Sequence, residues 1–354
     1  MTSLPSDVLD GLVASGRESG GAVAVVRDGV IHVEHAAGTC RGAEAWALDT
    51  LVMTFSVAKP LAAWAFLDAV AEGHLDLDQT VVSVWPVFGQ AGKEGTTLRH
   101  LLAHQAGLPA FPEEALEVEY DDREALVDLL ARQAPIHRPG AGVAEHALTY
   151  GHLLDEVLRR ATGEQLADRF ARIAGEAGWD LHLRVADHDL PRVATVVDPD
   201  GTWRSGYLAD PRWGPALGRP RGLLDPDVLN SDRFRRTSFP AVALHATARG
   251  LALFYDDVIR PDGRVADRLG HGLWRTYTEP ASSGHDVVLD EPVTWTLGFQ
   301  VSDEEGSLVL GMGGAGGCAA WADPRAGYGA AFLTRRLGGL DRVELVWEAV
   351  AACV

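Results

Sequence analysis

The sequence predicts a mixed α/β protein of the α+β type, in which an antiparallel sheet flanked by terminal helices carries a mostly helical lobe. Strand patterns lie near the N-terminus and in the last part of the chain, whereas helical patterns dominate the middle. The length of 354 residues exceeds the roughly 100–200 residues of an ordinary domain. We therefore predict one two-lobed domain over 1–354, with a sheet lobe at about 1–75 and 258–354 and a helical lobe at about 76–257.

The first elements follow from apolar spacing and turn residues. Residues 7–15 have the spacing of an amphipathic helix. The apolar runs 22–26 and 30–33 flank an Arg-Asp-Gly turn, which is typical of a β-hairpin. A helix is expected to begin near Ser56, because Pro60 is tolerated in a first helical turn, where the backbone N–H groups have no helical partner.

The remaining elements divide into central helices and late strands. Helical patterns cover 98–104, 123–133, 148–161 and 246–258. Strand patterns return at 293–301, 307–310, 319–322 and 329–334, before a last helix over 340–351. The stretch 198–226, rich in Pro, Gly, Asp and Trp, is too long for an ordinary connector. Long irregular loops are usually functional, so we predict that it forms part of a pocket wall.

Charge and composition narrow the classes of partner. A net charge of −19 argues against nucleic acid and anionic membranes, which need a basic face. The sequence shows neither a secretory leader nor a run of about 20 apolar residues, so a cytoplasmic protein is expected. Three scattered cysteines, Cys40, Cys318 and Cys353, predict reduced thiols and no thiolate metal site. We expect a neutral or cationic small-molecule partner; the composition leaves the oligomeric state open.

Ser56 and Lys59 form the most informative pair in the chain. Lysine occurs only at positions 59 and 93, although the chain holds 31 Lys and Arg residues. Residues i and i+3 of a helix share one face, which brings the Lys59 amine beside the Ser56 hydroxyl. Unlike arginine, a buried lysine can lose its proton near neutral pH. Ser56 is therefore a candidate nucleophile with Lys59 as its base.

Several segments resemble the serine β-lactamase-like superfamily of class C β-lactamases, DD-peptidases, family VIII esterases and related acyltransferases. The resemblance covers nearly the whole chain. Its carriers are Phe55-Ser56-Val57-Ala58-Lys59, Gly73 to Asp78, Thr97 to Pro109, His146-Ala147-Leu148-Thr149-Tyr150-Gly151, Trp295 to Phe299 and Gly311 to Gly317. It implies the β-lactamase/transpeptidase-like fold.

The resemblance also implies an acyl-enzyme mechanism, in which a serine attacks a carbonyl and divides one difficult step into two easier ones. Backbone N–H groups of Ser56 and Ala315 would hold the oxyanion. Loss of one such donor typically lowers the rate roughly 100- to 1000-fold. By position in the late Gly-rich strand, the substrate pocket would include Met312, Gly313, Gly314 and Cys318.

Glu145 departs from the family pattern. The register of the segment that follows it places Glu145 where the family has a tyrosine that shuttles protons, and Tyr150 lies five residues further on. A carboxylate beside Lys59 would favour the protonated amine, yet a buried carboxylate can itself serve as the base. Three alternatives stay open: Tyr150 is the shuttle, Glu145 replaces it, or Glu145 only pairs with Lys59 in a retired site.

Met312 is the second departure. The family usually has Lys, His or Trp at this place, and a cation there helps to receive the carboxylate of a β-lactam substrate. Methionine offers a polarizable apolar surface instead. We therefore predict poor turnover of penicillins and cephalosporins and better turnover of a neutral ester or amide.

Three functions remain compatible with the sequence. The first is a serine hydrolase of small-molecule esters or amides through acyl-Ser56, and the second is an acyltransferase that passes the acyl group to an amine or alcohol. The third is a retired binding protein. No cofactor is expected, and His100 and His104, although spaced i, i+4, lack the third ligand that a zinc site requires.

Overall fold

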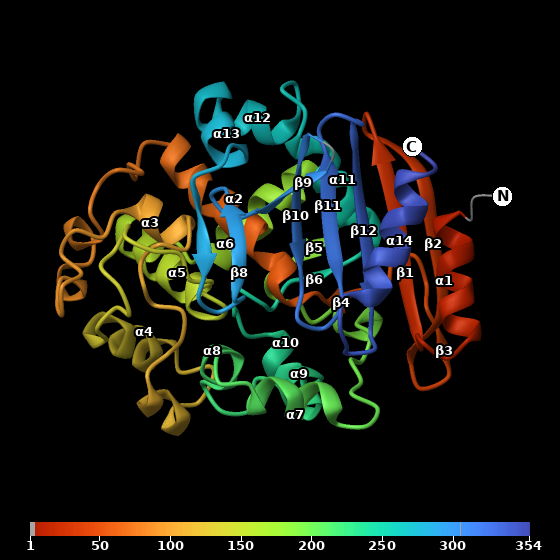
Figure 1. Cartoon of the computed structure of the whole chain (residues 1–354), viewed down its shortest axis with the longest axis horizontal. Coiled ribbons are helices and arrows are strands. Elements are labelled where there is room, and N and C mark those ends of the chain that lie inside the picture. The colour runs from red at the N-terminus through yellow and green to blue at the C-terminus, as the bar shows by residue number, and fades with distance from the viewer. Residues whose placement is uncertain (1–3, 305) are drawn as a thin grey trace.

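A nine-stranded antiparallel sheet forms the centre of the computed structural model, which describes residues 4–304 and 306–354 (Figure 1). The strand order, from one edge to the other, is β3 (Glu44–Ala45), β2 (Val30–Arg41), β1 (Gly20–Arg27), β12 (Tyr328–Thr334), β11 (Ala319–Asp323), β10 (Ser307–Gly313), β9 (Gln300–Glu304), β8 (Glu291–Trp295) and β7 (Ser282–Asp286). The two ends of the chain join where β1 pairs with β12, with Val23 opposite Phe332. The predicted antiparallel sheet with flanking terminal helices is confirmed.

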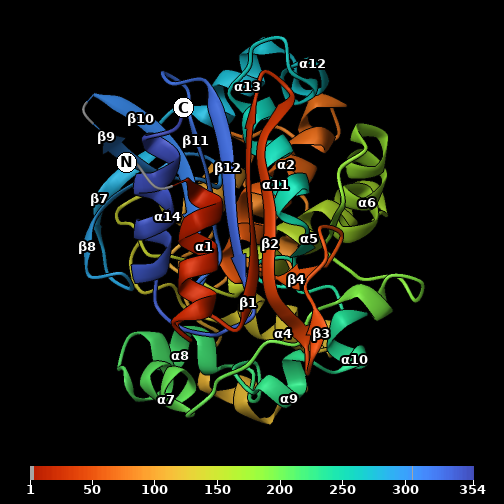
Figure 2. The same ribbon diagram turned by 90° about the vertical axis from the view of Figure 1, so that its right-hand side faces the viewer.

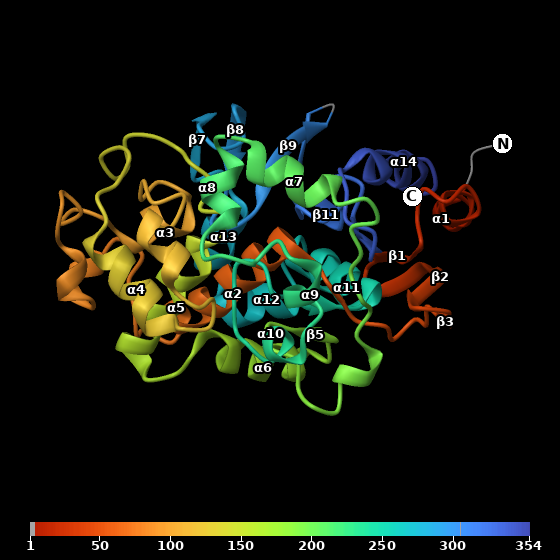
Figure 3. The ribbon, with the colours of Figure 1, turned by 90° about the horizontal axis from the view of Figure 1, so that it is seen from below.

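Helices cover both faces of this sheet. On one face α1 (Pro5–Ala14) and α14 (Asp341–Ala351) lie side by side, and Figure 2 shows them in front of β1 and β12. On the other face lie α2 (Ala58–Ala71) and α11 (Ala248–Val258), as the view from below shows (Figure 3). Because both faces are covered, β1 is buried along nearly its whole length.

Side-chain alternation along β1 explains this packing. Val23 and Val25 pack in the cluster formed with α1 and α14, whereas Ala24 and Val26 belong to the main core on the opposite face. Gly329 on β12 lets α11 approach closely, because a Cβ atom there would lie 2.2 Å from the Asp256 backbone nitrogen.

The helical part of the chain lies around α2. Its helices are α3 (Leu98–Leu102), α4 (Arg123–Arg132), α5 (Thr149–Thr162), α6 (Leu166–Ala177), α7 (Thr202–Ala209), α8 (Trp213–Gly218), α9 (Pro226–Leu229) and α10 (Asp232–Arg235). Of these, α3, α4 and α5 lie at the left of Figure 1 and α7 to α10 along its lower edge. Two further helices, α12 (Arg264–Leu269) and α13 (His271–Thr278), precede β7. Short 3-10 turns lie at Phe55–Val57, Val81–Ser83, Pro86–Phe88, Glu113–Glu117 and Leu190–Arg192. The division into two lobes near residues 75 and 258 stays a prediction.

A small sheet supports the start of α2. Its strands are β4 (Val52–Met53), β6 (His245–Ala246) and β5 (Leu181–His182), in that order. In β4, Met53 pairs with His245. This pairing fixes the backbone that leads directly into Ser56. None of the helices in residues 4–304 and 306–354 is both long and apolar enough to cross a bilayer.

Two expectations about local structure were wrong. The run 293–301 is two strands, because the chain turns at Thr296, whose N–H donates to the Phe299 carbonyl at 2.9 Å and whose hydroxyl accepts from the Phe299 N–H at 3.0 Å. Gly298 within the turn has a φ of +131°, which favours glycine. The stretch 198–226 is also not irregular throughout, since it contains α7 and α8.

Candidate active site

Ser56 lies in the 3-10 turn Phe55–Val57 immediately before α2. The preceding backbone is anchored by the Thr54 N–H, which donates to the Leu244 carbonyl at 2.8 Å. Phe55 has a φ of +53°, an unfavourable value for a bulky residue. Strained backbone of this kind persists only where the surrounding structure imposes it. Such strain is often found at functional sites.

Lys59 lies one helical turn after the serine. Its Nζ donates to the Ser56 Oγ at 2.6 Å, and its side chain is completely buried. Burial lowers the pKa of the Lys59 amine from its ordinary value, although the nearby Glu145 carboxylate acts in the opposite direction. Desolvation is the larger effect, while the Glu145 carboxylate favours the charged amine, which is the direction expected from the sequence. The amine can therefore accept a proton from Ser56.

Glu145 completes a chain of three polar groups. Its Oε1 lies 3.0 Å from the Lys59 Nζ, and only 4% of the Glu145 side chain is exposed. Two buried histidines hold the segment around it. The His146 N–H donates to the His104 Nδ1 at 3.0 Å, and the His146 Nε2 accepts from the Leu108 N–H at 3.1 Å. Burial lowers the pKa of His146 to about 3 and that of His104 well below its usual value, so both rings stay neutral.

Tyr150 lies away from this chain of groups, within the first turn of α5. Its hydroxyl donates to the Leu102 carbonyl at 3.4 Å, and its ring stacks on His104 with centroids 4.9 Å apart. Burial raises the pKa of the Tyr150 phenol far above its ordinary value. Tyr150 does not line the cavity that contains Ser56, so the structure brings Glu145 and not Tyr150 to the Ser56–Lys59 pair.

The Gly-rich segment after β10 turns tightly beside Ser56. The Gly314 N–H donates to the Cys318 carbonyl at 2.8 Å, and a Cβ atom on Gly314 would lie 2.2 Å from the Thr54 carbonyl oxygen. The Ala315 carbonyl accepts from the Trp203 Nε1 at 2.6 Å and from the Tyr207 hydroxyl at 3.4 Å. Within the part of the chain that the structure describes, the Ala315 N–H donates to no partner. This amide is available to a ligand.

A cavity of about 380 Å³ opens above the serine. Its walls combine Ser56, Glu145, the Gly-rich turn and a largely aromatic and aliphatic surface. The lining residues are Ser56, Glu145, Tyr207, Trp213, Leu217, Leu289, Glu291, Trp295, Gln300, Met312, Gly313, Gly314, Ala315, Gly338, Gly339 and Leu340. The predicted contribution of 198–226 to a pocket wall is confirmed by Tyr207, Trp213 and Leu217.

Sequence reasoning missed the individual residues of these walls. The Trp and Tyr content of 198–226 was the signal for Tyr207 and Trp213. Glu291 gave no signal, because it reaches the cavity only through the tertiary placement of β8, in which it pairs with Asp286 of β7. Burial and the Glu145 charge raise the pKa of Tyr207 to about 12, so its phenol stays protonated.

Met312 and Cys318 differ in position. Met312 lines the cavity and packs against Val143, Val293 and Trp295. Cys318 points into the core, where its sulfur accepts from the Thr334 N–H at 3.4 Å. Burial raises the pKa of Cys318 to about 12. Cys318 does not line the cavity, in contrast to its assignment to the substrate pocket.

His100, within α3, and His104, just after α3, have separate structural contacts. His100 accepts from the Thr97 N–H at 3.2 Å through its Nδ1, which closes a capping box at the start of α3. His104 holds the Glu145 segment as described above. No group of three or more metal-binding side chains is present in the described residues.

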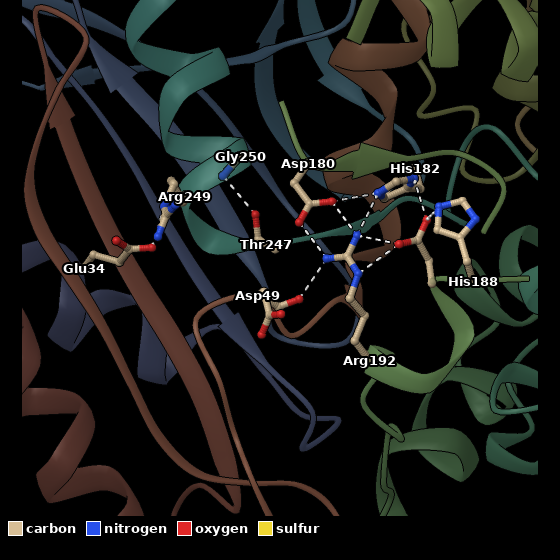
Figure 4. Close-up of polar contacts among 10 residues, drawn as sticks. Glu34, Asp49, Asp180, His182, His188, Arg192, Thr247, Arg249 and Gly250 are labelled. Carbon is tan, nitrogen blue, oxygen red and sulfur yellow. Dashed lines mark hydrogen bonds and ion pairs between the residues drawn. The ribbon is translucent and has the colours of Figure 1, made fainter. Parts of the chain in front are cut away.

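A second polar cluster, centred on Arg192, lies at β5, an edge strand of the small sheet (Figure 4). The Arg192 guanidinium binds the Asp180 carboxylate through both terminal nitrogens, at 2.6 and 2.7 Å, and also contacts Asp189 and the Asp49 carbonyl. The His182 Nε2 lies 2.8 Å from the Asp180 Oδ1. The cluster ties β5 to the segment before β4, and so supports the approach to Ser56.

This cluster gives a prediction for stability against pH. Burial alone would raise the pKa of Asp180, but hydrogen bonds from His182 and Arg192 outweigh it and hold that pKa well below its usual value. The stabilisation is therefore present above the unfolded-state pKa of about 4 and is lost as pH falls below it. Asp180→Asn is expected to lower the midpoint of thermal unfolding at pH 7, and to lower it less at pH 3.

The matched control is Asp267→Asn, because Asp267 is exposed and has no ion pair among the described residues. Its effect should be small at both pH values. Thermal unfolding followed by circular dichroism measures both variants. An Asp180→Asn effect of equal size at pH 7 and pH 3 would contradict the assignment of a depressed pKa.

A serine that follows a strained backbone position, a buried amine 2.6 Å from it, and a free backbone amide in an adjoining Gly-rich segment are typical of serine enzymes that work through a covalent acyl intermediate. The chain matches the Beta-lactamase family over residues 6–352 and belongs to that family. The β-lactamase/transpeptidase-like fold expected from the sequence is thereby confirmed.

Individual relatives agree with this assignment. The chain is 30% identical to the esterase/β-lactamase LipL of Mycobacterium tuberculosis (strain ATCC 25618 / H37Rv), over 91% of this chain and 78% of the relative. A penicillin-binding protein homologue from Caulobacter crescentus superposes with a TM-score of 0.85 at 29% identity, covering 99% and 96% of the two chains. A family VIII carboxylesterase gives 0.84 at 25% identity, with the same coverage. The protein is thus a serine hydrolase of the β-lactamase-like superfamily.

Proposed function

We propose that the protein cleaves a small-molecule carboxylic ester through an acyl-Ser56 intermediate, with Lys59 and Glu145 moving the proton. The observation that carries the proposal is the 2.6 Å contact between the Lys59 Nζ and the Ser56 Oγ inside a substrate-sized cavity. The names of the relatives, an esterase/β-lactamase and a family VIII carboxylesterase, support an ester as substrate.

The first step is attack by the Ser56 Oγ on the ester carbonyl carbon. The proton of the hydroxyl passes to the Lys59 amine as that amine gives a proton to the Glu145 carboxylate, and the lowered pKa of Lys59 supports this role. The negative charge that develops on the carbonyl oxygen is held by the N–H groups of Ser56 and Ala315. The free Ala315 amide and the close approach of Gly314 to Thr54 support this assignment.

The second step is departure of the alcohol. Lys59 is completely buried, whereas Glu145 lines the cavity, so Glu145 is the group that faces the leaving oxygen. The proton taken from Ser56 travels from Lys59 to Glu145 and then to the departing alkoxide. Acyl-Ser56 remains, and a water molecule then releases the acid and restores the serine hydroxyl.

Apolar side chains around Met312 make β-lactam antibiotics poor substrates in this proposal. Met312 packs with Val143, Val293 and Trp295, and no cation among the described residues lines the cavity to receive a substrate carboxylate. An amine or alcohol could also discharge acyl-Ser56 in place of water. Transfer is therefore the second candidate function, and the experiment below includes it.

Intact-protein mass spectrometry tests the proposal. Wild type and Ser56→Ala are mixed with a short p-nitrophenyl ester, with and without an added primary amine. Wild type is expected to gain the mass of one acyl group, which Ser56→Ala does not. Discharge of the adduct in buffer alone indicates hydrolysis, and discharge only with the amine indicates transfer. The proposal fails if several activated esters leave the wild type unmodified.

A further inference from the structure

The charged groups around the cavity are unevenly distributed. Two carboxylates, Glu145 and Glu291, line it, and none of the lining residues in the described chain is Lys or Arg. Glu145 is neutralised by Lys59 at 3.0 Å. Glu291 is exposed at the start of β8 and has no ion pair within residues 4–304 and 306–354. The cavity therefore carries one uncompensated negative charge.

Two arginines beside the cavity wall do not cancel this charge. Arg342 donates to the carbonyl of the lining residue Gly339, but its guanidinium is already paired with the Glu18 carboxylate. Arg212 precedes Trp213, but its guanidinium lies 2.7 Å from the Asp290 carboxylate and 3.2 Å from that of Asp210. Its charge is already matched by two carboxylates. The net charge of −19 adds a long-range field of the same sign as Glu291.

Aromatic rings form the rest of the binding surface. Phe55, Trp203, Tyr207 and Trp213 make a continuous series of edge contacts, with centroids 5.6, 5.5 and 5.6 Å apart. Tyr207 and Trp213 of this series line the cavity, and Trp295 lines it from β8. Ring faces attract ammonium groups, most strongly where water is excluded.

Glu291 and Trp295 lie at opposite ends of β8. Glu291 and Trp295 are four residues apart on β8, so they lie on the same face of the strand, about 13 Å apart between Cα atoms. A ligand that contacts both Trp295 and Glu291 must therefore extend along β8 over several bonds.

We propose that the cavity is selective for esters whose acyl chain carries an ammonium group a few carbons from the carbonyl, with Glu291 as the counter-charge and Tyr207, Trp213 and Trp295 as the aromatic surface. The inference rests on the proposed acylation of Ser56. Met312 fits the same specificity, because it offers no positive charge to an anionic acyl group.

Three p-nitrophenyl esters of similar chain length test the proposal. They carry 4-(trimethylammonio)butanoate, its neutral carbon isostere 5,5-dimethylhexanoate, and the anionic half-ester of glutarate. The second-order rate constant for acylation is expected to be about tenfold higher for the cationic ester than for the neutral one, and lowest for the anionic one. Raising the salt concentration from 0.05 to 0.5 M should reduce the ratio.

Glu291→Gln is expected to lower the cationic-to-neutral ratio about fivefold. The control is Glu279→Gln, because Glu279 is exposed, lies outside the cavity and has no ion pair among the described residues. Its ratio should equal that of the wild type.

Each outcome separates the two proposals. Equal or faster acylation by the neutral ester, or a ratio that Glu291→Gln leaves unchanged, overturns the ammonium specificity while acyl-Ser56 still forms. If none of the three esters acylates Ser56, the hydrolase proposal fails and the specificity fails with it.

Discussion

Replacing Glu145 with glutamine is expected to slow the turnover of an alkyl ester about 100- to 10,000-fold, the usual contribution of a general acid–base group. Glutamine has nearly the same shape as glutamate but cannot carry the proton from Lys59 to an alkoxide. A p-nitrophenolate leaves without needing a proton, so acylation by a p-nitrophenyl ester should fall less than about tenfold. Steady-state rates with the two ester types measure the difference.

Tyr150→Phe is the matched control for this prediction. The Tyr150 hydroxyl is buried and bonded to the Leu102 carbonyl at 3.4 Å, away from the cavity. The variant should lose about 0.5–1.5 kcal/mol of stability for the hydrogen bond and keep its activity on both esters. Loss of activity in Tyr150→Phe with survival of Glu145→Gln would mean that Tyr150 is the shuttle and that Glu145 is structural.

Lys59→Met is expected to destabilise the fold by about 3–5 kcal/mol, because it leaves the buried Glu145 carboxylate without its partner. Both side chains are almost fully excluded from water, at 0% and 4% exposure, so the charge has no alternative solvation. The double variant Lys59→Met/Glu145→Leu should recover most of the loss, since apolar residues often replace a buried ion pair at little cost. Urea unfolding followed by the fluorescence of the ten tryptophans measures these free energies.

Glu145→Leu alone should cost less than Lys59→Met. Burial has already lowered the pKa of Lys59, so the amine can lose its proton once the carboxylate is absent. The four free energies form a double-mutant cycle. Additive effects of the two single replacements would contradict a coupled pair and would remove the physical basis for proton transfer between Lys59 and Glu145.

The sequence predicted those parts of the fold that depend on local pattern. The Ser56–Lys59 spacing predicted a contact across one helical turn, and the structure has it at 2.6 Å. The apolar runs near both termini predicted the strands that pair as β1 and β12. The prediction of one strand over 293–301 was wrong, because two short strands joined by a turn have a composition similar to that of one longer strand.

Other parts depend on tertiary contacts that no local pattern contains. Two candidates for the proton shuttle were compatible with the sequence, and only the burial of Tyr150 against His104 and Leu102 places it away from the cavity. Glu291 lines the cavity through the placement of β8 beside β7, and Cys318 points away from the cavity, where its sulfur accepts from the Thr334 N–H of β12. The residue pattern of one strand does not determine which other elements lie opposite that strand across a cavity.

The contacts of α7 with the Ala315 carbonyl link substrate choice to reaction rate. The Trp203 indole and the Tyr207 hydroxyl hold the residue whose N–H is proposed to stabilise the oxyanion, and Tyr207 also forms part of the cavity wall. A change in α7 that reshapes this wall, whether evolved or engineered, therefore also displaces the Ala315 N–H that is proposed to bind the oxyanion. New specificity in this protein is more readily obtained from the β8 side, where Glu291 can change without moving Ala315.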